Sequence, residues 1–199
     1  TYDGLTASSV TVTNLDDDDP PPAEYWAYLP LLSGPPPAPA GLPDLVVQEL
    51  AVSSDGVTVV IANVGGSAVV DPFWVDVYID PDPVPTTSNQ IWQMLSEEGL
   101  AWGIGDDALP LQPGASLTLT VGDEYFVPDA SNFSGALAAG TPLYAQVDSA
   151  HSDTEYGAVL EAHEVDGEEY NNIAGPVLTP GTLIMSWSQT TPSHAPLLL

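Results

Sequence analysis

Phe73-Trp74-Val75-Asp76-Val77-Tyr78-Ile79-Asp80 is the stretch that decides the fold. Every second residue from Phe73 to Ile79 is apolar and either aromatic or β-branched, and the residues between them include a second aromatic set. This period of two is typical of a β-strand that rests one face on a hydrophobic core. The stretch therefore predicts a central strand.

Similar short apolar runs, separated by turn residues, lie on both sides of this strand. Ser53-Ser54-Asp55-Gly56 predicts a hairpin between the first two runs. A short helix is expected over 89–98, capped by Asn89 and ended by Gly99. Strands are expected at 45–52, 57–62, 116–121, 143–148, 158–161, 173–178 and 182–187. Short strands at this spacing predict an all-β, Ig-like antiparallel sandwich.

The composition narrows the possible partners. Among 199 residues there are 28 acidic side chains, no lysine and no arginine, so the formal net charge is −28. Phosphate backbones and anionic lipids have no basic patch to bind, which excludes nucleic acid and direct binding to anionic membranes. The absence of cysteine removes disulfides and thiolate chemistry.

The sequence also predicts where the protein works. No basic segment precedes an apolar one at the start, and the chain begins at Thr1, which fits a processed product secreted by a bacterium to its surface or surroundings. Trypsin-like proteases find no cleavage site in a chain without lysine or arginine. We therefore expect an extracellular, protease-resistant protein.

The order of several short motifs resembles the CARDB family, a bacterial Ig-like module associated with cell adhesion. The resemblance covers about residues 43–178. Two segments depart from the family pattern, namely the tryptophan-containing excursion at 81–105 and the acidic insert at 165–170. The motifs are Pro43-Asp44-Leu45-Val46-Val47, Asn63-Val64-Gly65, the stretch 73–80, Leu111-Gln112-Pro113-Gly114, Tyr144-Ala145-Gln146-Val147-Asp148, and Val159-Leu160-Glu161 through Asn171-Asn172-Ile173. The resemblance implies an adhesive or structural spacer, and it brings no active site.

No catalytic pattern is present in the sequence. The histidines His151, His163 and His194 lack catalytic spacing, and there is no nucleophile elbow, zinc-protease motif or phosphate-binding loop. The prediction is a protein that is not an enzyme and that requires no cofactor.

Hard cations are a possible ligand, because they prefer several carboxylate oxygens. An acidic group near the end of the last strands is the best candidate for calcium: Asp148, Glu161, Glu164, Asp166 and Glu168. The alternative is a solvated acidic rim. A zinc site that uses His151 or His163 is less well supported, since no paired histidine spacing accompanies either residue.

Glycans are a second possible partner. Trp26, Trp74, Trp92, Trp102 and Trp187 could stack on sugars, or they could fill the core. Asn132-Phe133-Ser134 is an acceptor sequence for N-glycosylation. A secreted adhesion or carbohydrate-binding module, with or without calcium, is therefore the alternative function.

The terminal segments suggest the leading function. Residues 1–42 form a proline-rich arm, 43–178 the sandwich, and 179–199 a C-terminal strand and tail. The arm contains an alternating run around Val10 and Val12 and an apolar anchor with Trp26, Tyr28, Leu29 and Leu31. Such an arm either folds back on its own sandwich or adds a strand to a neighbour's sheet. The sequence favours a homopolymer, a structural subunit of an extracellular filament or surface assembly.

Overall fold

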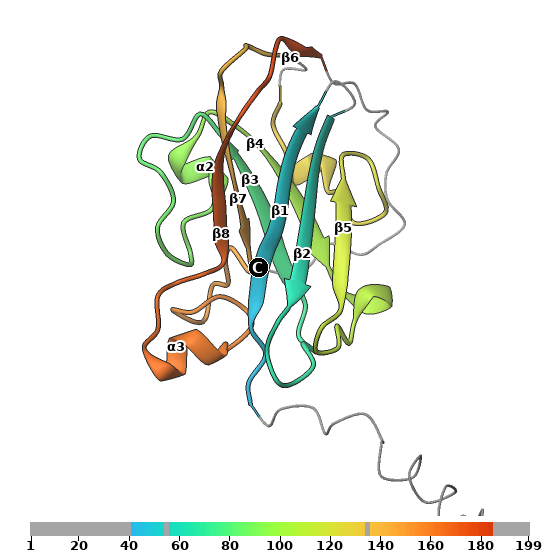
Figure 1. The fold of residues 1–199 in the computed structure, drawn as a ribbon, viewed down its shortest axis with the longest axis vertical. Helices are drawn as coiled ribbons and strands as arrows, with labels where there is room; N and C mark the ends of the chain where they lie inside the picture. Colours follow the sequence, from blue (N-terminus) through green and yellow to red (C-terminus); the bar gives the residue numbers. More distant parts are fainter. Residues whose placement is uncertain (1–40, 54–55, 134–135, 185–199) are drawn as a thin grey trace, which may run out of the picture. The chain divides into compact units, whose positions relative to one another are not determined.

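The computed structural model describes residues 41–53, 56–133 and 136–184, and within them two antiparallel sheets face each other (Figure 1). The first sheet has the order β1-β2-β5, formed by Leu45–Ser53, Gly56–Asn63 and Ser116–Thr120. The second has the order β4-β3-β7-β8, formed by Glu98–Ile104, Phe73–Ile79, Pro142–Val147 and Ile173–Leu178. The predicted antiparallel β-sandwich is confirmed.

β3, which the alternating stretch 73–80 predicts as a central strand, lies inside the second sheet. β3 pairs with β4 on one side and β7 on the other. The predicted hairpin joins β1 and β2, with Ser53 opposite Gly56. A small third sheet pairs β6, Ala136–Leu137, with β9, Leu183–Ile184. β9 lies within the predicted C-terminal strand, whose remainder is outside the described residues.

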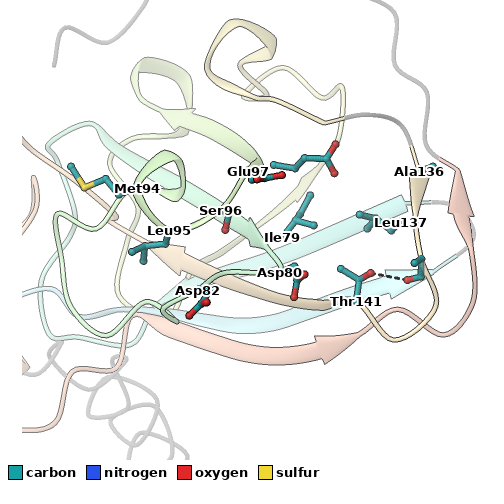
Figure 2. Close-up of a pocket in the computed structure, with 12 residues that line it drawn as sticks. Ile79, Asp80, Asp82, Met94, Leu95, Ser96, Glu97, Ala136, Leu137 and Thr141 are labelled. Atoms are coloured by element: carbon teal, nitrogen blue, oxygen red, sulfur yellow. Dashed lines mark hydrogen bonds between the residues drawn. The ribbon is translucent and has the colours of Figure 1, made fainter.

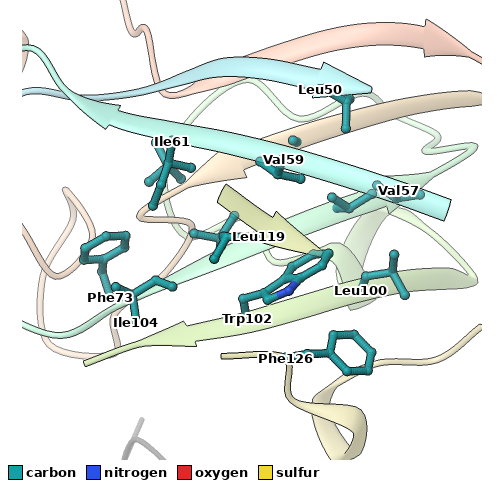
Figure 3. Close-up of a cluster of buried hydrophobic side chains, with 14 of the residues drawn as sticks. Leu50, Val57, Val59, Ile61, Phe73, Leu100, Trp102, Ile104, Leu119 and Phe126 are labelled. Atoms are coloured by element: carbon teal, nitrogen blue, oxygen red, sulfur yellow. The ribbon is translucent and has the colours of Figure 1, made fainter. Parts of the chain in front are cut away.

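The core fills the space between the two sheets. In Figure 3, side chains from β2 and β5 point toward side chains from β3 and β4. Trp102 is fully buried there and meets Phe126 edge to face, with ring centroids 5.5 Å apart. Its indole N–H donates to the carbonyl of Thr120 over 3.1 Å, which ties β4 of one sheet to β5 of the other.

The helix predicted over 89–98 is present but shorter than predicted. The helix α2 covers only Trp92–Leu95, and residues from Glu98 onward form β4. Leu100, Trp102 and Ile104 of β4 are buried against the core, and Gly99 and Ala101 on its other face are buried near Trp92 of α2, so both faces of this strand are covered. Asn89 has φ 60 and does not cap the helix.

The strand predicted at 158–161 is wrong. The amides of Ala158 and Val159 donate to the carboxylate of Asp148 over 2.8 and 2.9 Å. Glu161 then caps the helix α3, Ala162–Asp166. Two 3-10 turns, Asp106–Ala108 and Pro128–Ala130, complete the short elements. No helix in the described part of the chain is long and apolar enough to span a membrane.

Candidate functional site

A cluster of polar side chains lies where the start of β1 meets α3. Asp44 immediately precedes β1, and Glu161 and His163 stand at the beginning of α3. His163 Nδ1 is 3.3 Å from Asp44 Oδ1 and 3.9 Å from Glu161 Oε2. Glu161 is fully buried and His163 is 3% exposed, whereas the Asp44 side chain is 19% exposed. We call these three residues the Asp-Glu-His cluster.

The local sequence of α3 explains how these side chains are placed. Glu161 is the N-cap residue, and its backbone N–H donates to Glu164 Oε2 over 3.0 Å, as in a capping box. Gly167 ends the helix in the left-handed conformation, φ 73. The helix is therefore fixed at both ends, and Glu161 and His163 both face inward.

Two asparagines and a backbone amide hold the carboxylates. Asn171 Nδ2 donates to Asp44 Oδ1 over 3.0 Å, and Asn172 Nδ2 donates to Glu161 Oε1 over 2.6 Å. The backbone N–H of Leu45 donates to Glu161 Oε2. Each carboxylate is thus oriented by a separate donor.

Burial dominates the electrostatics of this end of the sandwich. It raises the pKa of Glu161 to about 9 and that of Asp148 to about 7, despite the hydrogen bonds that each carboxylate accepts. It also raises the pKa of Glu164. Because the sequence contains no lysine or arginine, none of these carboxylates has a permanently charged partner in the chain.

The structure brings together only part of the predicted calcium site. Asp148, Glu161 and Glu164 lie close enough to influence one another, and the charges of Asp148 and Glu164 both raise the pKa of Glu161. However, among the described residues Asp148 is not in the group whose ligand atoms approach one another closely, and both of its oxygens accept from backbone amides. Asp166 and Glu168 are exposed beyond these residues. The predicted five-residue set does not converge on one point.

Sequence reasoning missed Asp44 as a candidate ligand. In the sequence, Asp44 stands out only as part of the motif that opens the first strand. It is 119 residues from His163 in the chain, so sequence spacing gives no sign of their contact. No local spacing signals the pair. His163 was considered for zinc, but without partners.

A groove lies between β3, α2 and β6. Figure 2 shows this groove, about 610 Å³ in volume, with the side chains that line it. Asp80, Asp82, Glu97 and Glu98 give it an acidic lining. Exposed carboxylates of this kind are expected on a chain of charge −28 and do not by themselves define a ligand.

The three described tryptophans, Trp74, Trp92 and Trp102, pack against other side chains of the fold. Trp102 is fully buried, and Trp92 is 5% exposed, with its indole N–H donating to Ala130 O over 3.0 Å. Trp74 is partly buried against the same outer cluster as Trp92. Trp26 and Trp187 lie outside the described residues. The rings of Trp92 and Trp102 therefore belong to the packing of the fold.

The remaining predicted sites fall partly outside the described residues. Asn132 is exposed, and its side-chain amide donates to Glu97 O over 2.9 Å, while Ser134 of the same acceptor sequence is not described. The arm residues Val10, Val12, Trp26, Tyr28, Leu29 and Leu31 also lie outside the described residues.

The outer edge of β5, to which no strand is paired among the described residues, is a further candidate for binding. Thr120 N donates to Asp123 Oδ2 over 2.6 Å and Thr120 O accepts from Trp102, so the backbone groups of Thr120 point away from β2. Backbone groups of an edge strand alternate in direction, so those of Ser116 and Thr118 also point away from β2. All three of these residues are exposed.

No family model, curated protein or solved structure matches this chain.

Proposed function

We propose that the protein is a non-catalytic structural subunit of an extracellular assembly, and that neighbouring copies join when an arm adds a strand to the outer edge of β5. The observation that carries this proposal is the outward backbone edge of Ser116 and Thr118 on an exposed strand. Unpaired strand edges are templates for another extended chain.

β5 lacks the features that usually protect an edge. Its sequence, Ser-Leu-Thr-Leu-Thr, contains no charge and no proline. Lysine, the commonest protecting residue on such edges, is absent from the whole chain. At Ser116 and Thr118 an incoming strand would meet neither a charged side chain of β5 nor a missing donor, whereas the backbone groups of Thr120 are already bonded to Asp123 and Trp102.

The other outer edges of the two large sheets, among the described strands, are covered, interrupted by proline or bent by a bulge. β4 is covered by the segment around Asn132, which exchanges backbone hydrogen bonds with Gly99 over 2.7 and 2.9 Å. β8 contains Pro176, which has no N–H. β1 has an irregularity between Val47 and Glu49. β5 is therefore the most accessible edge for strand addition.

The arm contains a run whose alternating side chains match those of β5, so this run would serve as the added strand. Its run Val10-Thr11-Val12-Thr13 alternates apolar and hydroxyl side chains, as β5 does. In an added strand, Val10 and Val12 would share the face of Leu117 and Leu119, which contact the core. Backbone pairing and apolar contact need no opposite charge, which suits copies that each carry −28.

The test compares two substitutions at one edge position in the full chain. Thr118→Pro removes the outward N–H, and Thr118→Val keeps it with a similar side-chain volume. We expect the wild type and Thr118→Val to sediment as assemblies in 0.5 M NaCl, and Thr118→Pro to sediment as a folded monomer. Far-UV circular dichroism checks the folding of each variant.

Two results would overturn the proposal. One is a wild-type protein that stays monomeric at millimolar concentration, as expected if the arm folds back on its own sandwich. The other is a Thr118→Pro variant that assembles like the wild type. Should Thr118→Pro fail to fold, a variant with Val10→Asp and Val12→Asp leaves the sandwich unchanged and must give the same loss of assembly.

A further inference from the structure

The Asp-Glu-His cluster has the composition and spacing of a metal site. Its three ligand atoms, Asp44 Oδ1, Glu161 Oε2 and His163 Nδ1, all lie within 4.8 Å of one another. We propose that these three side chains bind a divalent transition-metal ion, for which zinc is the ion that the ligand set favours. This inference is independent of strand addition at β5.

The distances within the cluster fit a small ion. Zinc bonds of roughly 2.0–2.1 Å in a tetrahedral arrangement place neighbouring ligand atoms roughly 3.3 Å apart. His163 Nδ1 is already 3.3 Å from Asp44 Oδ1 and 3.9 Å from Glu161 Oε2. The three ligand atoms lie within 4.8 Å of one another, so side-chain movements of up to roughly 1.5 Å would bring them to zinc distances while α3 and β1 stay in place.

Unpartnered polar atoms at the cluster are a second, independent observation. Asn172 is fully buried, and its Oδ1 has no hydrogen-bond partner in the described part of the protein, although its Nδ2 contacts Glu161. Asn171 Oδ1 is likewise without a partner, while its Nδ2 contacts Asp44. A half-turn of the Asn172 carboxamide exchanges its oxygen and nitrogen, which would give up its hydrogen bond to Glu161 Oε1 and present an unused oxygen to a cation at the cluster.

The surroundings also orient the ligands. The backbone N–H of Leu45 holds Glu161 Oε2, and Asn171 Nδ2 holds Asp44 Oδ1. Hydrogen-bonded carboxylates of this kind are the usual outer shell of a protein metal site. The ligands are therefore held in position before an ion arrives.

A groove gives solvent access to the cluster. It is about 570 Å³ in volume and is lined by Asp44, Ala162 and Asp166, with the exposed valines Val64 and Val165 beside them. Asp44 lies in its wall, and Ala162 is the residue between Glu161 and His163. An ion or a water ligand can reach Asp44 through this groove, while the two other ligands remain buried.

The ligand types distinguish between ions. Calcium and magnesium prefer oxygen ligands throughout, and calcium takes six to eight of them. An imidazole nitrogen between two carboxylates suits zinc and its neighbours in the first transition row. The bound ion would connect the beginning of β1 to α3 and would neutralise carboxylates that have no lysine or arginine to pair with.

The experiment is a metal titration of the full chain after dialysis against a chelator. ZnCl₂ is added in 0.15 M NaCl and followed by calorimetry, and CoCl₂ is followed by its ligand-field absorption. We expect one saturable zinc site, the visible bands of four-coordinate cobalt, and a rise in Tm that millimolar CaCl₂ does not reproduce.

Matched variants separate this site from nonspecific binding. Asp44→Asn and Glu161→Gln keep the size of the side chain and should lower zinc affinity by at least roughly tenfold. Asp166→Asn removes a carboxylate from the same groove, and His151→Gln removes the other described histidine; both should bind zinc as the wild type does. Circular dichroism of the metal-free variants checks that Asp44→Asn and Glu161→Gln fold.

The proposal is overturned if zinc produces no saturable binding, or if folded Asp44→Asn binds it as tightly as the wild type. It is also overturned if His151→Gln or Asp166→Asn abolishes the binding, since the ion would then sit elsewhere. Should both ligand variants fail to fold, the cobalt spectrum of the wild type decides, because binding by carboxylates alone gives weak octahedral bands.

Discussion

The carboxylate of Asp76 accepts a hydrogen bond of 3.0 Å from the backbone N–H of Trp92, and this bond ties the centre of β3 to the helix that covers it. Asp76 is only 3% exposed, and burial raises its pKa from the ordinary 3.8 to about 7. The aspartate that interrupts the apolar run of the decisive strand is therefore an internal, proton-binding group.

The stability of the protein should fall as the pH rises from about 4 to about 7. The folded protein holds a proton on Asp76 over this range, whereas the unfolded chain has released it, so the free energy of unfolding decreases with pH. Asp148, with a pKa of about 7, contributes in the same direction. Asp76→Asn keeps an acceptor for Trp92 and should stabilise the protein at pH 8 by up to roughly 4 kcal/mol.

Urea unfolding of both proteins at pH 5 and pH 8 measures this difference. Asp71→Asn, which removes an exposed carboxylate, is the control for the general effect of net charge. Equal gains from Asp76→Asn and Asp71→Asn at pH 8 would contradict the role assigned to burial.

Trp102 should be the most costly single residue to truncate. It is fully buried, contacts Phe126 edge to face, and donates to Thr120 O in the opposite sheet. Trp102→Ala should lower the free energy of unfolding by about 3 kcal/mol or more, through the cavity and the lost hydrogen bond. Chemical denaturation provides the measurement, and Met94→Ala, at a position that is 66% exposed, should change stability little. A minor effect of Trp102→Ala would show that the ring is not in the core.

Gly99 should not tolerate a side chain. A Cβ at this position would lie 2.3 Å from Trp92 Cδ2, so Gly99→Ala must displace the ring that α2 packs on the sheet. We expect a loss of about 2 kcal/mol and a change in tryptophan fluorescence. At Gly181 a Cβ would meet no atom within 4 Å, so Gly181→Ala should leave both measurements unchanged.

Sodium chloride should stabilise the fold at neutral pH. The chain carries −28 and has no lysine or arginine pairs that salt could weaken, so screening acts mainly on repulsion. Raising NaCl from 10 to 500 mM should increase Tm by several degrees in a calorimetric scan. The gain should shrink at pH 4, where many carboxylates are protonated. A decrease of Tm with salt at pH 7 would indicate that attractive pairs dominate.

Local patterns predicted most of the strands and failed where several weak signals competed. The alternation in β3 and β5 and the turn chemistry between β1 and β2 identified these elements correctly. The expected helix over 89–98 takes in Glu98, and no strand is predicted for residues 99–104, although Leu100, Trp102 and Ile104 alternate there. The pairing of this segment with β3 decides its conformation, and that pairing is a long-range interaction.

The residues of the candidate site were also predicted only in part from local sequence. Glu161 was selected because acidic residues gather near it in the sequence, and Asp166 and Glu168 were selected for the same reason. α3 turns Glu161 inward and leaves the other two exposed. Asp44 joins Glu161 only because β1 begins beside α3 in the folded chain.

The sequence by itself determined the acidic charge, the absence of lysine, arginine and cysteine chemistry, and the alternation that makes a β-sandwich. These properties depend on composition or on neighbours a few residues apart. Only the tertiary structure decided that Trp102 fills the core, that Asp76 is buried, and that Asp44 meets Glu161 and His163. Those outcomes depend on which distant segments pack together, since burial and proximity, rather than residue type, set the pKa of a carboxylate and its partners.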